Sequence, residues 1–428
     1  MERLEELIIK YRLTPVFLAI YLFMQPFKQM SGVRNTAFVL VLLIFILKLA
    51  RKKVSIDFKD RTIQGLAALI VACVLSAALS PYPLDSFDFI RKNLAYQAVI
   101  FLVVITEFKT FDELKPVFYA LIGGFAFLSI LVLLNNNIDV LLHWLDEPNK
   151  GRPFLGGYSL YATFYIPLAV GYLYSSNDSA KMKGLIIFFI VLEFILSVLN
   201  NHRTQIVAFT AGVFLSTLLA KKYKVIAAGI IFCIISGVVI LEMNPSAFDR
   251  YKTLLNPRNY VSNDHEGLND RLAIWHGTVD MIEDRPIAGW GYGWKKLSWV
   301  ARDKGYIEKW DKSGRTHLYF NDNGYGKANP HNLVLQILFE IGIIGLLAFL
   351  FFWATILYKS ISVFGKRFSP PASFLKYGVT GMLLSYALIN YTNGLWEESS
   401  GVLMMTFAAC SFVLYRQLNS TAEEKQWH

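Results

Sequence analysis

The sequence predicts an all-α protein that crosses a membrane many times. Of its 428 residues, 54% are hydrophobic and only 17% are charged, and the mean hydropathy is +0.41. Soluble domains carry about 25% charged residues, so this chain is short of the polar side chains that would cover a soluble exterior. The same composition excludes a disordered chain, a collagen and a disulfide scaffold.

Twelve apolar runs predict the transmembrane helices. Several are shorter than the roughly 20 residues that a span needs, so we expect them to tilt or to extend into flanking polar residues. No pattern of a removable signal peptide opens the chain. The runs lie near 13–27, 36–50, 62–80, 94–106, 116–134, 158–174, 184–200, 204–220, 223–241, 331–358, 373–391 and 399–415.

The distribution of Lys and Arg predicts the orientation. If the N-terminus is cytoplasmic, the inner segments hold 22 basic residues and the short outer loops hold seven. Positive charge concentrates in short cytoplasmic loops, so we expect both termini to be cytoplasmic. The remaining 13 basic residues lie in one long loop, 242–330, which is then external. The predicted organisation is 1–241 with nine helices, 242–330 as a large external loop, and 331–428 with three helices and a cytoplasmic tail.

The long loop is the first place where function is expected, because structureless loops of this length are uncommon. Within it, Arg271, Trp275, Val279 and Ile282 recur at helical spacing, which predicts a short amphipathic helix on the membrane. The segment Arg285-Pro-Ile-Ala-Gly-Trp-Gly-Tyr-Gly293 follows it. Its glycine spacing does not fit a dinucleotide-binding loop, so tight turns between aromatic residues are expected.

Four arginines are expected at the outer ends of the helices and in the loop. Each one alone is typical of an interface anchor that reaches lipid phosphates. Together they suit a ligand with two phosphates, because guanidinium groups bind phosphate oxygens in pairs. They are Arg152 before the sixth span, Arg203 in the tight turn between the seventh and eighth spans, and Arg271 and Arg285 in the loop.

His331 is the strongest single candidate for a catalytic residue. It lies in the segment Asn329-Pro-His-Asn-Leu-Val-Leu-Gln336, which opens the tenth span. Pro330 fits the first turn of a helix, which would put His331 at the positive end of the helix dipole. That position favours the neutral imidazole, which can accept a proton from a hydroxyl group. A capping or interface histidine is an equally good interpretation from the residues alone.

Two carboxylates lie inside predicted spans, where charge is costly. Glu340 is nine residues after His331, about 13 Å deeper along a helix, and a structural role as partner of a buried polar group is favoured. The role of Glu193 stays open. Asp264-His-Glu266 has the acid-x-acid form of some metal-dependent transferases, but solvated loop is the better interpretation.

These residues together resemble the O-antigen ligase and O-antigen polymerase superfamily. The resemblance covers about 150 to 350 and rests on the order of Arg203, Asn-Asp-Arg271-Leu-x-x-Trp275, Arg285-Pro-Ile-x-Gly-x-Gly291 and Pro-His331-Asn-x-x-Leu-Gln336-x-x-x-Glu340-x-Gly-x-x-Gly345. The last string is the most specific. After Arg152 the family often has Asn-Pro-Asn, where this chain has Gly156-Gly-Tyr158, and a basic aromatic insert occupies 295–327; both differences could alter the acceptor.

The resemblance implies a glycosyltransferase of the C type, with about twelve transmembrane helices, in the bacterial inner membrane. Such a ligase transfers a glycan as one block from a polyprenyl (undecaprenyl) diphosphate to a sugar hydroxyl of lipid A–core at the periplasmic face, in lipopolysaccharide biosynthesis. It needs no metal, cofactor, nucleotide or nucleic acid. His331, Arg203 and Arg271 would be catalytic, Arg152, Arg285, Asn332 and Gln336 would bind substrate, and Trp275 and Glu340 would support them.

Three alternatives stay open. A polymerase would join lipid-linked repeat units instead, and a related ligase would modify protein. A flippase for lipid-linked oligosaccharides is a different class of protein, and it should show two related halves around a charged central cavity. This chain instead concentrates its polar residues at one face and has one large asymmetric loop, which favours the ligase.

Overall fold

The computed structural model describes residues 13–136, 158–200, 203–243, 268–323, 328–366 and 369–424, and every regular element in these ranges is a helix. Arg152, Asp264 and Glu266 therefore lie outside the described residues, and so does the side chain of Arg203, although Arg203 itself begins a helix. The prediction of an all-α fold is confirmed for the part of the chain that is described.

Each of the twelve apolar runs carries a helix, in which the backbone N–H and C=O groups bond to one another, as an apolar environment requires. By length and composition, seven helical segments within the described ranges could cross a membrane, and shorter apolar helices accompany them. A polytopic membrane protein is thereby confirmed, and the count of twelve spans stays a prediction. The helices are α2 (Leu13–Phe23), α3 (Ser31–Ala50), α4 (Arg61–Leu79), α5 and α6 (Pro83–Phe89 and Ala95–Glu107, joined by the π-helix Ile90–Leu94), α7 (Phe111–Asn135), α9 (Tyr158–Ser175), α10 (Ala180–Leu199), α11 (Arg203–Leu219), α12 (Tyr223–Met243), α18 (Leu333–Ile361), α19 and α20 (Pro370–Ser373 and Thr380–Asn390, joined by the π-helix Phe374–Val379) and α21 (Glu398–Glu424).

Side-chain contacts between the ends of separate helices define two distinct ends of the bundle. At one end, Lys48 donates to Thr14 and pairs with Glu107 at 2.7 Å, and the backbone N–H of Phe111 donates to Gln417 at 2.9 Å. Both ends of the described chain therefore lie at this end, which we call the terminal end. At the opposite loop end, the start of α3 meets the start of α21 through Arg34 and Ser399, at 3.3 Å.

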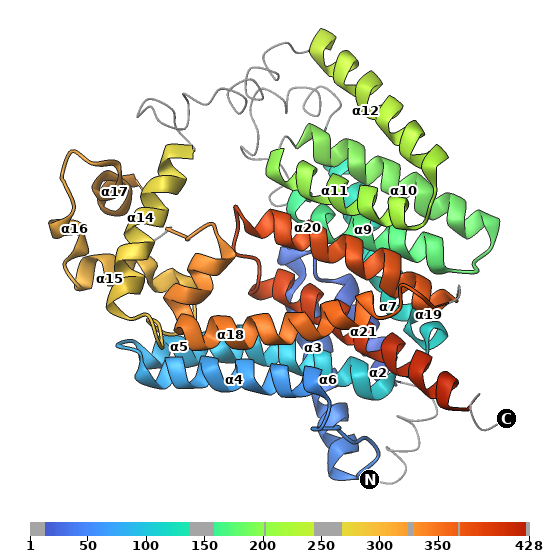
Figure 1. Ribbon diagram of the computed structural model, residues 1–428, viewed down its shortest axis with the longest axis horizontal. Coiled ribbons are helices and arrows are strands. Elements are labelled where there is room, and N and C mark those ends of the chain that lie inside the picture. Colours follow the sequence, from blue (N-terminus) through green and yellow to red (C-terminus); the bar gives the residue numbers. More distant parts are fainter. Residues whose placement is uncertain are drawn as a thin grey trace.

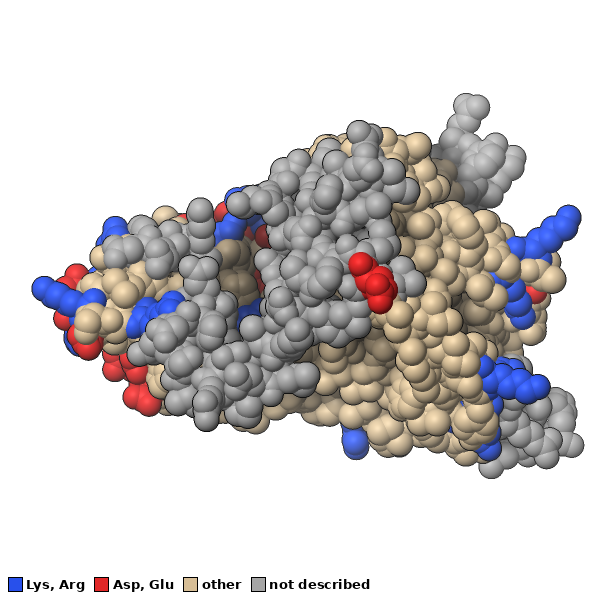
Figure 2. All heavy atoms as spheres, turned by 90° about the horizontal axis from the view of Figure 1, so that it is seen from above, with Lys and Arg blue, Asp and Glu red and all other residues tan. Residues whose placement is uncertain are grey.

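The flanks of the bundle are apolar where they face outward. Large exposed hydrophobic side chains cover them. In the view of Figure 2, Lys and Arg lie mainly toward the two ends, and the described surface between them is largely uncharged. An apolar surface of this extent on a monomer needs a non-aqueous environment, and lipid supplies it. Examples are Val71 and Leu75 on α4, Ile231 and Ile234 on α12, and Leu347 and Leu350 on α18.

A second, smaller hydrophobic core lies at the loop end (Figure 1). It is built by α14 (Leu268–Asp284), by α15 (Leu297–Asp303) and α16 (Tyr306–Lys309), and by the π-helix Tyr319–Asn323 that follows α17 (Arg315–Leu318). Helix α14 covers the residues expected to be helical, whereas its place on the membrane stays a prediction. Acidic side chains of α14 hold the aromatic residues of the insert: Asp280 accepts from Trp310 at 2.7 Å, and Asp284 accepts from Tyr306. The described part of the insert, 295–323, is thus folded against α14.

Candidate active site

His331 lies at the loop end, in the short connection that leads into α18. Asn332 is the N-cap of this helix, since its side chain accepts from the backbone N–H groups of Val334 and Leu335 at 3.0 and 3.1 Å. The expectation that Pro330 occupies the first helical turn is therefore wrong, because Asn332 caps the helix two residues later. His331 adopts a left-handed backbone with φ of 48°, and its N–H donates to Asn329 at 2.8 Å.

Helix α14 holds this connection from the side. The indole Nε1 of Trp275 donates to the carbonyl oxygen of Pro330 at 2.9 Å, and its ring meets Tyr391 edge-on, with centroids 5.9 Å apart. Arg271 lies four residues before Trp275, on the same face of α14. The structure thus brings Arg271, Trp275 and His331 together, although 60 residues separate the arginine from the histidine in sequence.

The environment of His331 keeps its imidazole neutral. Burial and the nearby positive charge of Arg271 lower the pKa of His331 from 6.5 to about 4. A neutral imidazole near pH 7 has a nitrogen lone pair that can accept a hydrogen bond or a proton. The neutral form inferred from the sequence therefore agrees with this environment, although burial, and not the helix dipole, is the main cause.

Helix α18 is broken at Gly342, and the loop segment 286–293 fills the break. Gly342 has φ of 65° and ψ of −167° within the helix. Backbone groups that lose their helical partners at the break form hydrogen bonds with the loop. The N–H groups of Trp290 and Gly291 donate to the carbonyl oxygens of Phe339 and Glu340, both at 2.8 Å. The N–H of Ile343 donates to the carbonyl oxygen of Pro286 at 2.8 Å. A broken helix in a membrane protein persists where other protein groups replace its lost hydrogen bonds. Here the loop segment 286–293 supplies these groups to α18.

Two serines, one in α4 and one at its C-cap, complete this junction. The carbonyl oxygen of Glu340 also accepts from the hydroxyl of Ser76 at 2.7 Å, and that of Trp290 accepts from Ser80 at 2.5 Å. Sequence reasoning missed both serines, because a hydroxyl within an apolar run carries no signal of its partner.

The other predicted substrate ligands make contacts within the protein. Arg285 donates to the carbonyl oxygen of Leu79 at 2.8 Å and lies over the ring of Trp290, 5.2 Å from its centroid. The amide of Asn332 donates to the carbonyl oxygen of Tyr391 at 3.2 Å. Gln336 is fully buried and donates to Glu340 at 2.7 Å. Their binding of substrate stays a prediction that these contacts do not test.

Glu340 is fully buried and hydrogen-bonded, as expected for a structural carboxylate. One of its oxygens accepts from Gln336, and the other accepts from the backbone N–H of Gly293 at 2.9 Å. Glu193 is also buried, on α10, and its Oε1 meets no hydrogen-bond donor within the described part of the chain.

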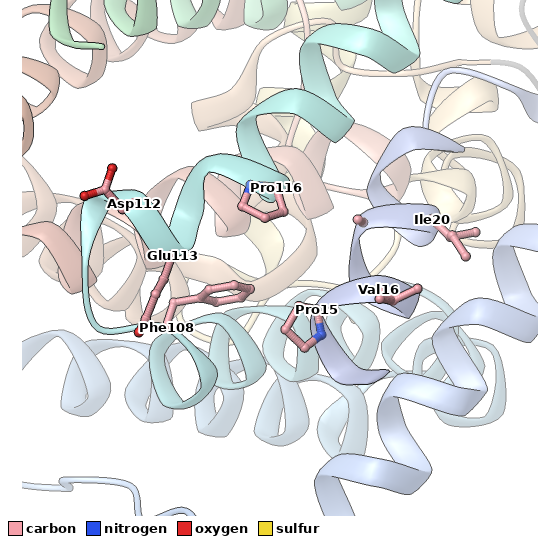
Figure 3. Close-up of a pocket in the computed structure, with 8 residues that line it drawn as sticks. Pro15, Val16, Ile20, Phe108, Asp112, Glu113 and Pro116 are labelled. Atoms are coloured by element: carbon pink, nitrogen blue, oxygen red, sulfur yellow. The ribbon is translucent and has the colours of Figure 1, made fainter. Parts of the chain in front are cut away.

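A pocket of about 420 Å³ lies at the other end of the bundle and is not part of this site. It lies between α2 and α7 at the terminal end (Figure 3). Its lining is mainly apolar, with two carboxylates at its edge; it consists of Pro15, Val16, Ala19, Ile20, Phe108, Asp112, Glu113 and Pro116. His331 is at the loop end, so this pocket cannot contribute to its chemistry.

The fold and the site define a polytopic, all-helical membrane protein that holds a neutral histidine beside an arginine at one end of its bundle. Residues 187–350 match the family model described as O-antigen ligase. This range contains α14, His331 and the part of α18 that includes the break at Gly342. These residues thus match an O-antigen ligase domain, and the resemblance found in the sequence is confirmed.

Curated relatives agree with this match. A putative polysaccharide ligase of Rickettsia bellii is 25% identical over 361 residues, which cover 79% of this chain and 78% of the relative. The O-antigen ligase of Salmonella typhimurium is 24% identical over 310 residues, which cover 71% of this chain and 72% of the relative. A putative polysaccharide ligase of Rickettsia typhi is 22% identical over 322 residues, or 73% of each chain.

Proposed function

We propose that this protein is a glycosyltransferase that transfers a glycan as one block from a polyprenyl diphosphate carrier to a sugar hydroxyl of lipid A–core. The observation that carries the proposal is the neutral His331 held beside Arg271 within the matched ligase domain. The reaction takes place at the periplasmic face of the inner membrane, where the loop end lies, and both termini are cytoplasmic.

In this reaction His331 is the general base. Its free ring nitrogen accepts the proton of the acceptor hydroxyl, and the acceptor oxygen attacks the anomeric carbon of the donor sugar. The bond from this carbon to the phosphate oxygen breaks, and the diphosphate leaves with the electron pair. Attack from the face opposite the diphosphate inverts the anomeric centre.

Arg271 stabilises the charge that develops on the leaving diphosphate, together with Arg203. Fixed cationic donors at the position where negative charge appears lower the barrier of such a step. Arg152 and Arg285 contribute further positive charge, Asn332 contributes its amide near the acceptor, and the fully buried Gln336 acts through its bond to Glu340. No metal, nucleotide or other cofactor takes part in this mechanism.

The donor itself would activate the base. A histidine with a pKa of about 4 is a weak base at neutral pH, since general bases work best near the pH of operation. The positive charge of Arg271 is one of the two causes of this low value. A bound diphosphate offsets that charge and raises the pKa of His331, so the imidazole becomes a stronger base only when the donor is present.

The glycan that remains attached to the lipid carrier distinguishes a ligase from a polymerase. In cells that lose this gene, a ligase predicts long glycan chains that stay attached to the polyprenyl carrier, and lipid A–core without glycan. Accumulation of single repeat units on the carrier would instead identify a polymerase. Transfer that a chelator abolishes, and that added metal restores, would overturn the metal-free mechanism.

A further inference from the structure

A cluster of three ionisable side chains is buried where the loop, α18 and α21 meet, and the mechanism above uses none of them as a reacting group. Glu340 and Lys296 are fully buried, and Glu397 is 4% exposed. Lys296 follows the segment that fills the break in α18, whereas Glu397 directly precedes α21. The cluster therefore joins three parts of the chain that are distant in sequence.

The charges of the cluster are balanced only if it keeps one proton. Two ionised carboxylates and one ammonium would leave a net negative charge in a site closed to water, and an uncompensated buried charge is strongly unfavourable. The other charged neighbours, Asp85 near Lys296 and Glu398 near Glu397, are both acidic and cannot supply the balance. One carboxyl group must therefore be protonated.

The hydrogen bonds indicate which carboxyl group holds the proton. Both oxygens of Glu340 already accept from fixed donors, Gln336 at 2.7 Å and the N–H of Gly293 at 2.9 Å. Both oxygens of Glu397 are buried without an N–H or O–H donor within the described residues, and its carboxyl group interacts with that of Glu340. Two adjacent carboxyl groups can share a hydrogen bond only if one of them donates a proton.

We propose that Glu397 is protonated and donates this hydrogen bond to an ionised Glu340, whose charge Lys296 balances, and that this cluster positions His331. In agreement with this assignment, burial and the charge of Glu340 raise the pKa of Glu397 well above its ordinary value. The ammonium of Lys296 also donates to the carbonyl oxygen of Tyr292. This bond fixes the end of the loop segment 286–293, which fills the break in α18.

The positioning role follows from the place of Glu340 on α18. The same helix begins immediately after His331, and the segment held by Lys296 leads back to α14, which carries Arg271 and Trp275. A loss of the cluster would let α14 and the start of α18 move independently. A misplacement of about 1 Å at a reacting group can reduce the rate about 100-fold. This role in catalysis rests on the proposed function, whereas the protonation of Glu397 does not.

The shared proton is tested by infrared spectroscopy of the full-length protein in lipid nanodiscs, without any substrate. We expect Glu397→Gln to remove the carbonyl stretching band of one protonated carboxylic acid. Asp112→Asn, which changes an exposed carboxyl paired with Lys115, should leave this band unchanged. Lys296→Met should increase the band, because both carboxyl groups must then be protonated. An unchanged band in Glu397→Gln would overturn the proposal.

The location of the proton is tested by comparing two matched variants. Glu397→Gln keeps a neutral donor toward Glu340 and should unfold at nearly the wild-type temperature. Glu340→Gln removes the ionised carboxylate that balances Lys296 and leaves one amide oxygen in place of two carboxylate oxygens, so it should unfold at a clearly lower temperature. Glycan transfer should follow the same order, with a loss of about tenfold or more only in Glu340→Gln. Equal destabilisation by both variants would overturn the assignment to Glu397. If the wild-type protein transfers no glycan while the infrared result holds, the proposed function fails and the protonation of Glu397 stands.

Discussion

The indole N–H of Trp275 donates a hydrogen bond to the carbonyl oxygen of Pro330, with an N···O distance of 2.9 Å. This bond joins α14 to the residue directly before His331. It fixes the connection in which His331 adopts its left-handed backbone, and it lies one helical turn from Arg271. The arrangement of the candidate site therefore depends on a hydrogen bond in which neither His331 nor Arg271 takes part.

We expect Trp275→Phe to reduce glycan transfer more than it reduces stability. Phenylalanine keeps an aromatic ring against Tyr391 but cannot donate to Pro330. The lost hydrogen bond should cost about 1 kcal/mol of stability, whereas transfer should fall about tenfold through misplacement of His331. Thermal unfolding and transfer assays on the same preparation check this. Trp299→Phe, which changes a tryptophan packed against Tyr82, is the control. Equal transfer by both variants would contradict a positioning role of Trp275.

The low pKa of His331 predicts how stability depends on pH. The folded-state pKa is about 4, below the ordinary value of 6.5. As the pH falls from 6.5 to 4, the unfolded chain takes up a proton that folded His331 does not, so the free energy of unfolding decreases. This loss of stability reaches at most about 3 kcal/mol. Above pH 6.5 it does not occur, because His331 is then neutral in both the folded and the unfolded chain.

We expect His331→Asn to show a smaller loss of stability over this pH range than the wild type. Asparagine tolerates a left-handed backbone, so the variant removes the titrating group without backbone strain. Thermal unfolding between about pH 7 and about pH 4.5 measures the difference. Identical pH profiles for the two proteins would show that His331 is not buried in its neutral form.

The break in α18 predicts a strong effect of a single methyl group. In Gly342→Ala the new Cβ would lie 2.2 Å from the carbonyl oxygen of Ile287, at a φ of 65° that alanine rarely adopts. We expect a destabilisation of about 3 kcal/mol or more. Gly184→Ala, in a helix where nothing lies within 4 Å of the new Cβ, should instead be neutral or stabilise by up to about 1 kcal/mol. Unfolding temperatures of both variants test this. A stable Gly342→Ala would contradict the docking of the loop into the break.

Arg285 is expected to hold the docked segment as well as to carry charge. In Arg285→Lys the positive charge stays, but lysine lacks the planar group that bonds to Leu79 and covers Trp290. We expect a loss of about 1–3 kcal/mol of stability. Arg91→Lys changes an exposed arginine and should be close to neutral. If Arg285→Lys raises only the KM for the donor and leaves unfolding unchanged, its structural role is excluded.

The helices could be predicted from the sequence, because hydropathy over 20 residues is a local property. The amphipathic helix around Arg271 and Trp275 could be predicted for the same reason. The break at Gly342 could not, because it depends on the loop that fills it. The glycines of the two motifs do indicate close backbone approach, but the sequence does not indicate that they approach one another.

The site was predicted in part. The sequence singled out Arg271, Trp275 and His331, and the structure brings them together. The role of Asn332 and Gln336 toward the substrate stays a prediction; in the structure Asn332 caps α18 and Gln336 is a buried partner of Glu340. Glu397 and Lys296 were not singled out, because a carboxylate at the end of a span and a lysine in a basic insert look like surface residues until the chain folds over them.

The most direct test of the account is the fate of the lipid-linked glycan in cells whose only copy of this protein is His331→Asn. Membrane level and unfolding temperature at pH 7 are measured first, to establish that the variant is folded. If His331 is the catalytic base, long glycan chains then accumulate on the polyprenyl carrier, with lipid A–core left bare. Lipid A–core that carries glycan at the wild-type level in these cells would contradict it.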